Sequence, residues 1–180
     1  MNLKDLARPL TVAEVEFRVD RINELQNGGA IAHFLVYKNA RVDMQRLDDV
    51  VGPNNWTRQH ARDNKNCIVS IWDNEKGVWV GKEDVGTESS YQKDKGLASD
   101  SFKRACFNWG IGRELYSYPK ISIRLNQGEF YKKGNSVNLV FGFTDGLVWV
   151  VQHDENGDVS YVGCKNKTGL RFQYGTYKND

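Results

Sequence analysis

Basic residues gather in one stretch of the chain, Lys93 to Arg113, which reads KDKGLASDSFKRACFNWGIGR. The stretch holds five basic residues and only two acids, Asp94 and Asp100, in a chain of 180 residues whose net charge is +2. Its basic residues are Lys93, Lys95, Lys103, Arg104 and Arg113. Flexible cations on one surface can neutralise the phosphates of a nucleic acid without reading its bases. The stretch is therefore a candidate nucleic-acid interface.

The same stretch has the pattern of an amphipathic helix. At 100° per residue its small and apolar residues fall on one side. They are Ala98, Phe102, Ala105, Cys106 and Trp109. Lys93 and Arg104 point the opposite way, with Lys103 on the flank between. Because surface lysines and arginines need no functional explanation, charge alone leaves a solvated face and a binding face equally open.

Arg41 is a further candidate for phosphate contact. It begins a second predicted helix that runs to Val51 and is ended by Gly52 and Pro53. An arginine near a helix N-terminus opposes the helix dipole and is locally unfavourable. This placement favours a role for Arg41 outside its own helix.

Three acids, Glu83, Asp84 and Glu88, could belong to a metal-dependent nuclease. Glu83 and Asp84 are neighbours on a predicted strand, however, and neighbouring side chains on a strand point to opposite faces. Solvation of the strand end and pairing with Lys82 is the favoured explanation. The nuclease stays open as the alternative function.

Other catalytic chemistry is not indicated. The chain has no GxxxxGK[ST] phosphate loop, which argues against an ATP-driven strand exchanger. His33, His60 and His153 lie in no HExxH or triad-like context. We therefore predict no catalytic residue, no cofactor and no metal site.

Composition favours a cytoplasmic protein without a membrane partner. Mean hydropathy is −0.62, and no run approaches the roughly 20 apolar residues of a membrane span. The opening MNLKDLARPL has no apolar segment of a secretory signal. Cys67, Cys106 and Cys164 are odd in number and lack metal-ligand spacing, which favours reduced thiols.

The elements before the basic helix begin with another predicted helix, from Thr11 to about Gln26. Thr11 and Glu14 have the spacing of a capping box, and Val12, Val15, Val19 and Ile22 follow at helical intervals. A strand is predicted from Ala30 to Tyr37. Three further strands with short turns form an antiparallel meander. They span Trp56–Arg62, Cys67–Trp72 and Val78–Val85.

The chain after Pro119 is rich in predicted strands. They span Ile121–Leu125, Val137–Phe143, Leu147–Gln152 and Val159–Gly163. Lys165 to Asp180 is polar and predicted to be a frayed tail. The order of elements predicts an α+β fold in which one curved antiparallel sheet carries packed helices.

Several runs resemble the RAD-fifty-two/Sak family of single-strand annealing proteins. They are EDVGTES (83–89), KDKGLASDSFKRACFNWGIG (93–112), ARVDMQRLDDVVGPNNW (40–56) and LARPLTVAEVEFRV (6–19). The family carries a strand ending in an EDVG-like tetrapeptide, followed by a helix with a D-x-x-KRA core. The last run resembles the opening of short phage-type members. Together the runs cover roughly residues 6–118, and they occur in the family's order.

The resemblance implies a β-β-β-α core that assembles into rings or arcs, with single-stranded DNA in a basic outer groove. Residues 1–118 would form the annealing core and residues 119–180 a β-rich extension of the same domain. Matched motif by motif, the groove residues fall on Arg41, Lys103 and Arg104. Lys93 and Lys95, on the same helix, complete the predicted DNA-binding set.

The implied activity is ATP-independent binding and annealing of single-stranded DNA in homologous recombination and repair, as a phage protein in the bacterial host cytoplasm. The implied partners are single-stranded DNA and further copies in a ring, arc or filament, and a single-strand-binding protein is a candidate. Phe107 stands where longer members are basic, and Lys76 and Lys82 are possible counterparts of their outer DNA site. A metal-dependent nuclease, or a β-rich interaction protein with an incidental basic helix, remain open.

Overall fold

The computed structural model describes residues 2–60, 63–87 and 93–178, without the side chains of residues 93–95. The chain divides into two compact units. Unit 1 comprises residues 1–9 and 38–113, and unit 2 comprises residues 10–37 and 114–180. The chain passes between the units three times, so each unit is built from separate segments.

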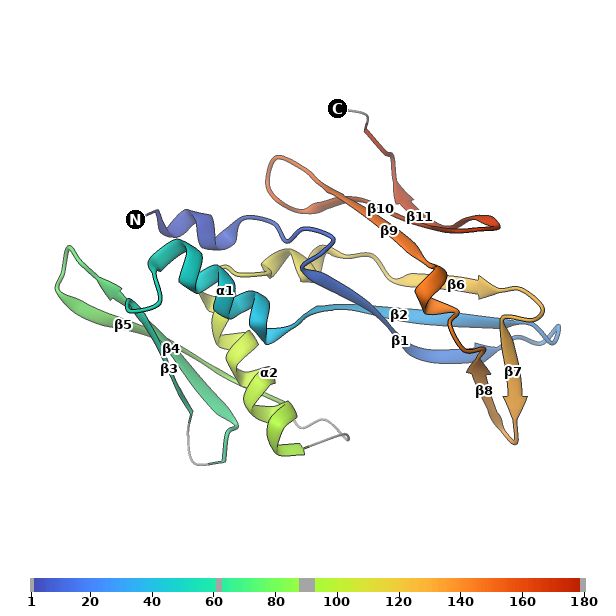
Figure 1. Cartoon of the computed structure of the whole chain (residues 1–180), viewed down its shortest axis with the longest axis horizontal. Helices are drawn as coiled ribbons and strands as arrows, with labels where there is room; N and C mark the ends of the chain where they lie inside the picture. The colour runs from blue at the N-terminus through green and yellow to red at the C-terminus, as the bar shows by residue number, and fades with distance from the viewer. Residues whose placement is uncertain (1, 61–62, 88–92, 179–180) are drawn as a thin grey trace. The chain divides into compact units, whose positions relative to one another are not determined.

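Unit 1 packs two helices on one face of a three-stranded antiparallel sheet, in the order β3-β4-β5 (Figure 1). Its elements are a 3-10 turn η1 (Leu3–Ala7), α1 (Ala40–Val51), β3 (Trp56–His60), β4 (Asn66–Asp73), β5 (Val78–Val85) and α2 (Lys93–Asn108). Alternate residues of β4, namely Cys67, Val69 and Ile71, are buried against Leu47 and Phe102. The period-two pattern of the sequence therefore places one face of this sheet in the core.

Unit 2 packs two three-stranded sheets face to face, with a hairpin beside them. One sheet has the order β1-β2-β6, the other β11-β10-β9, and the hairpin is β7-β8. The strands are β1 (Val15–Glu24), β2 (Ala30–Lys38), β6 (Ile121–Leu125), β7 (Phe130–Lys133), β8 (Ser136–Leu139), β9 (Val148–His153), β10 (Val159–Asn166) and β11 (Gly169–Gly175). Short 3-10 turns are η2 (Arg113–Ser117) and η3 (Thr144–Gly146). Phe17 stacks on Trp149 in the core, with ring centroids 4.0 Å apart.

The prediction of an α+β fold is confirmed, and so are α1, β2, the β3-β4-β5 meander and α2. The single curved sheet is wrong, because the described strands form four small antiparallel sheets. The expected frayed tail contains β11, and β7 was also missed. The division at residue 118 stays a prediction about domains.

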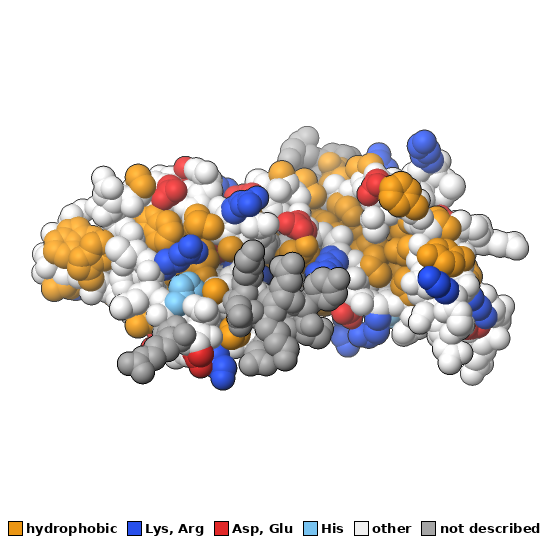
Figure 2. Space-filling view, turned by 60° about the horizontal axis from the view of Figure 1, so that its bottom comes forward, with side chains coloured by type: hydrophobic (Ala, Val, Ile, Leu, Met, Phe, Trp, Pro, Cys, Tyr) orange, Lys and Arg blue, Asp and Glu red, His pale blue; other side chains and the backbone are white. Residues whose placement is uncertain are grey.

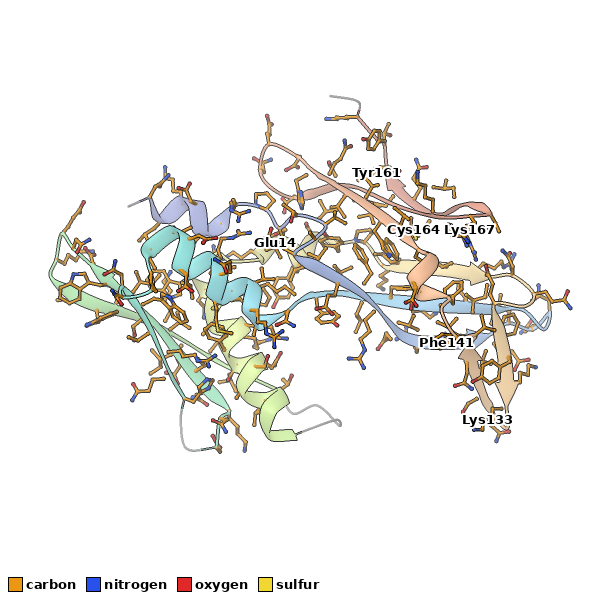
Figure 3. The ribbon with its side chains drawn as sticks, in the orientation of Figure 1. Glu14, Lys133, Phe141, Tyr161, Cys164 and Lys167 are labelled. Carbon is orange, nitrogen blue, oxygen red and sulfur yellow. The ribbon has the colours of Figure 1, made fainter. Side chains whose placement is uncertain are left out.

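The predicted helix from Thr11 to Gln26 is wrong, since Val15–Glu24 is strand β1. The capping interaction itself forms. The Thr11 amide donates to Glu14 Oε2 at 2.8 Å, and Glu14, labelled in Figure 3, closes a turn instead of starting a helix. The β-branched residues that suggested a helical stripe are also good strand formers. Val15, Phe17 and Val19 alternate along β1 and contribute to the core of unit 2, and this burial decides the outcome.

Candidate nucleic-acid interface

The glycine of the EDVG run lets the end of β5 approach α2 closely. A Cβ atom on Gly86 would lie 2.7 Å from the Ser101 backbone nitrogen and 2.9 Å from the Leu97 carbonyl oxygen. Both neighbours are backbone atoms of α2 and cannot move aside separately. The Gly86 amide also donates to the Lys65 carbonyl at 2.7 Å. Only a residue without a side chain fits this crossing.

Polar residues of the same two runs bond to each other. Arg104 Nε lies 3.3 Å from Asp84 Oδ1, and the Thr87 amide donates to Asp100 Oδ2 at 2.9 Å. Asn108 Nδ2 donates to the Glu83 carbonyl at 2.9 Å. The EDVG and D-x-x-KRA runs therefore hold β5 against α2. Several residues that carry the sequence resemblance therefore have a packing role.

The acids considered for a nuclease do not converge. Glu83 accepts a hydrogen bond from Asn66 Nδ2 at 2.6 Å, whereas Asp84 pairs with Arg104 across the helix-bearing face of the sheet. Glu88 lies outside the described residues. Within the described part of the chain, no group of three or more His, Cys, Asp or Glu side chains could hold a metal ion. The expected divergence of Glu83 and Asp84 is confirmed.

Lys38 and Asp43 form an ion pair in the interior of unit 1. Their side chains are 1% and 0% exposed. The Lys38 ammonium also lies 4.4 Å from the centroid of the Phe107 ring, a favourable cation–π contact. Lys38 stands directly before Asn39, whose side chain caps α1, while Phe107 is on α2. The pair thus joins the start of α1 to α2.

Burial dominates the electrostatics of this pair. It lowers the pKa of Lys38 and raises the pKa of Asp43 to about 6, although each partner opposes the other's shift. The positive charge of Lys103 acts on both groups and lowers both pKa values. Burial raises the pKa of Cys106, on α2, well above its usual range, with the Asp43 charge as a further cause. Lys103 lies about one turn before Phe107 on α2, and the Phe107 ring is the one that contacts Lys38 directly before α1.

Arg41 occupies the first turn of α1 and is exposed. Its amide donates to the Asn39 side chain at 3.0 Å, so the capping residue fixes the backbone from which the guanidinium extends. In the described residues Arg41 has no ion-pair partner. The structure thus places Arg41 and the half-buried Lys103 on the two elements that meet at Lys38.

The other predicted site residues are either paired with an acid or have side chains that the structure does not describe. Arg104 is 40% exposed and paired with Asp84, so its charge is already compensated in part. Lys93 and Lys95 begin α2, and their side chains lie outside the described part of the structure. Lys38 was missed by the sequence analysis. The available signal was a lysine ending an apolar strand, with an acid five residues later.

Two cationic side chains donate to backbone carbonyls at the C-terminal end of α2. Arg113 donates to the carbonyls of Phe107 and Asn108 at 2.7 and 3.0 Å, which complements the negative end of the helix dipole. Lys82 donates to the Asn108 carbonyl at 2.7 Å and lies 4.3 Å from the Trp109 ring centroid. These contacts give Arg113 and Lys82 structural roles.

In Figure 2, Lys and Arg side chains lie among hydrophobic and acidic ones.

The three cysteines are free and buried. None of the described helices is long and apolar enough to cross a membrane.

Comparison with known proteins gives one informative similarity. No family model matches the chain, and no solved structure matches it. The chain is 33% identical over 91 residues to the single-stranded DNA-binding protein DdrA of Deinococcus radiodurans. The alignment covers 49% of this chain and 43% of DdrA. The similarity is thus distant and partial, and it joins this chain to a protein that binds single-stranded DNA.

Proposed function

We propose that this protein binds single-stranded DNA and anneals complementary strands without ATP, in recombination and repair. The observation that carries the proposal is the similarity to DdrA, which extends over about half of the chain. The ordered motifs of residues 6–118 support it. Bound phosphates would be neutralised while the bases stay free to pair, so no covalent step is needed.

Arg41 and Lys103 are the proposed principal phosphate contacts. Both are cations without an ion-pair partner among the described residues, and their elements meet at the Lys38–Asp43 pair. Arg104 would contribute by exchanging Asp84 for a phosphate. Lys93 and Lys95 would extend the same surface along α2.

Assembly of several copies is part of the proposal. The β3-β4-β5 sheet ends in β3 on one side and β5 on the other, and neither edge pairs with another described strand. Free strand edges can pair between copies, and repeated head-to-tail contacts close into a ring or continue as a filament. The finer proposal is a phage-type recombination protein in a bacterial cytoplasm that meets a single-strand-binding protein there.

Fluorescence anisotropy with a labelled oligothymidylate tests the site. The variant Arg41→Ala/Lys103→Ala is expected to bind several-fold more weakly at low salt. The slope of log affinity against log salt should fall by about 1.4, since each lost contact to a single strand contributes about 0.7. Annealing of complementary oligonucleotides without ATP should slow in parallel.

The matched control is Lys4→Ala/Lys65→Ala, which removes two exposed cations from the same unit. Its affinity should stay near that of the unchanged protein. Equal losses in the two variants would sink the site assignment. Oligonucleotide cleavage that needs Mg²⁺ or Mn²⁺ and is abolished by chelator would instead favour the nuclease.

A further inference from the structure

The β1-β2-β6 sheet of unit 2 has one face in the core and one face outside it. Ala32, Phe34 and Ile123 are buried against the second sheet. Because side chains alternate along a strand, the residues between them point outward. Register pairs His33 with Ser122 and Ile31 with Arg124 on this outer face. The outward residues of β1, β2 and β6, together with Lys120 directly before β6, form what we call the outer face.

The outer face carries uncompensated positive charge. Arg18, Lys120 and Arg124 are exposed, and none of them has an ion-pair partner among the described residues. Two acids share the face. Asp20 is paired with Arg21 at 3.1 Å, and Glu16 accepts a hydrogen bond from the uncharged Tyr37 hydroxyl, so Arg18, Lys120 and Arg124 still outnumber the acid that is outside an ion pair. Arg18 follows Glu16 by two residues along β1, so its side chain lies on the same face as the contact between Glu16 and Tyr37. The surplus is thus spread over β1 and β6.

A shallow hollow of about 430 Å³ lies on this side of the sheet. Its lining includes Arg21, His33, Leu35, Lys120 and Ser122. His33 is fixed in it, since Asn23 Nδ2 lies 3.1 Å from Nε2 and Ser122 Oγ lies 2.9 Å from Nδ1. Both ring nitrogens of His33 therefore have a hydrogen-bond partner, and the planar ring lies between cationic residues.

Leu35 supplies an apolar surface beside this hollow. Its side chain is 56% exposed although it belongs to the middle strand of the sheet. Exposed apolar and planar groups between cations suit a single strand, whose bases can lie on side chains while its phosphates reach Lys and Arg. Residues rise by about 3.3 Å each along a strand, so Lys120 and Arg124, four positions apart, are about 13 Å from each other and can contact separate phosphates.

We propose that the outer face is a second binding surface for a single nucleic-acid strand, with phosphates at Arg18, Lys120 and Arg124 and bases over Leu35 and His33. It rests on the proposed function, and it adds a site in unit 2 to the cations of unit 1. Charge complementarity with the phosphodiester backbone favours a nucleic acid over a second copy of this mildly basic chain.

A label on the outer face reports local contact. Burial raises the pKa of Cys67 to about 11 and that of Cys164 to about 12, and it also raises that of Cys106. Thiolate, the reactive form, is therefore scarce at all three positions. Leu35→Cys adds one exposed thiol that a polarity-sensitive dye can label selectively. Leu170→Cys on β11, where the native side chain is 63% exposed, is the control position.

Binding of oligothymidylate should change the emission of the dye at position 35 and leave the dye at position 170 unchanged. The variant Lys120→Ala/Arg124→Ala should bind several-fold more weakly, with a salt slope smaller by about 1.4. Lys165→Ala/Lys167→Ala is its control in the same unit, since both lysines are exposed; Lys167 is labelled in Figure 3. Circular dichroism and the thermal midpoint verify folding of each variant.

Several results would overturn the inference. One is equal affinity for oligothymidylate in Lys120→Ala/Arg124→Ala and in its control, Lys165→Ala/Lys167→Ala. Another is a change in the emission of the dye at position 35 when only the protein concentration is raised. That change would show that this face contacts a second copy of the protein. If the unchanged protein does not bind oligothymidylate, the proposed function and this inference both fail. If it binds, and only Arg41→Ala/Lys103→Ala is impaired, the outer face alone is refuted.

Discussion

Lys38 and Asp43 are almost completely withdrawn from water, at 1% and 0% exposure. Desolvating an ion pair costs several kcal/mol per ion, and the attraction between the partners only offsets this cost when the geometry is good. The pair is therefore a weak source of stability. Its effect is positional, because it sets the start of α1, and with it Arg41, against Phe107 of α2.

Removing Lys38 tests this view. Lys38→Met leaves Asp43 buried without its counter-charge, so the free energy of unfolding should fall by about 3–5 kcal/mol at pH 7.5. The pKa of Asp43 is about 6 in the folded protein, above the value near 3.9 of an unfolded chain. The folded state therefore takes up the proton first, and protonation favours folding as the pH falls through 6. Urea titrations should show a smaller loss at pH 5 than at pH 7.5.

The double variant Lys38→Met/Asp43→Leu is the matched control. With both charges replaced by apolar groups, most of the lost stability should return, and its dependence on pH between 5 and 7.5 should weaken. A loss from Lys38→Met that is equal at both pH values would contradict the proposed burial of a charged Asp43.

At the scale of elements, the crossing of β5 and α2 depends on one glycine. Gly86→Ala would force a methyl group into the backbone of Leu97 and Ser101, at 2.9 and 2.7 Å. We expect a loss of about 1–3 kcal/mol in the free energy of unfolding, measured by urea titration. Because α2 carries Lys103, its displacement should also weaken oligothymidylate binding.

Gly146→Ala is the control for the glycine substitution. A Cβ atom there meets no atom within 4 Å, and its backbone is not left-handed. Its stability should change by no more than about 0.5 kcal/mol. A Gly86→Ala protein as stable as this control would show that β5 and α2 do not cross so closely.

Much of unit 1 was predictable because local patterns and burial agree there. Alternation in Cys67–Ile71 and the stripe through Phe102 and Cys106 both mark the faces that form its core. Strand β1 was not predictable by pattern, since Val15 and Val19 fit a helix or a strand until the facing sheet is known. The polar β11 was missed because its pairing with β10, not its composition, makes it a strand.

The predicted site shows the same limit. Sequence identified Arg41 and Lys103 as candidates, but it could not show that Asp84 compensates Arg104. That pair joins residues twenty positions apart and exists only through the crossing at Gly86. The outer face in unit 2 was equally unpredictable, because Arg18 and Arg124 come from distant parts of the chain and share a face only through the sheet in which β1 and β6 flank β2.

At the scale of the whole molecule, each compact unit is built from two segments that are separated in the sequence. Residues 10–37 carry β1 and β2, whose partner β6 and core neighbours Ile121, Ile123 and Val162 come after residue 118. Residues 1–9 belong with 38–113, where Leu6 is buried and Arg46 donates to the carbonyls of Leu6 and Arg8. A cut after residue 118 therefore separates the strands of one sheet.

A fragment of residues 1–118 is expected to keep unit 1 folded and lose the structure of residues 10–37. An isolated two-stranded hairpin is marginally stable at best, and without β6 and β10 it would expose Ala30, Ala32 and Phe34 to water. Hydrogen–deuterium exchange should show protected amides in α1, α2 and β3–β5 at the level of the full chain, and rapid exchange in β1 and β2. Protection of β1 and β2 in the fragment would instead show that residues 1–118 form a domain by themselves.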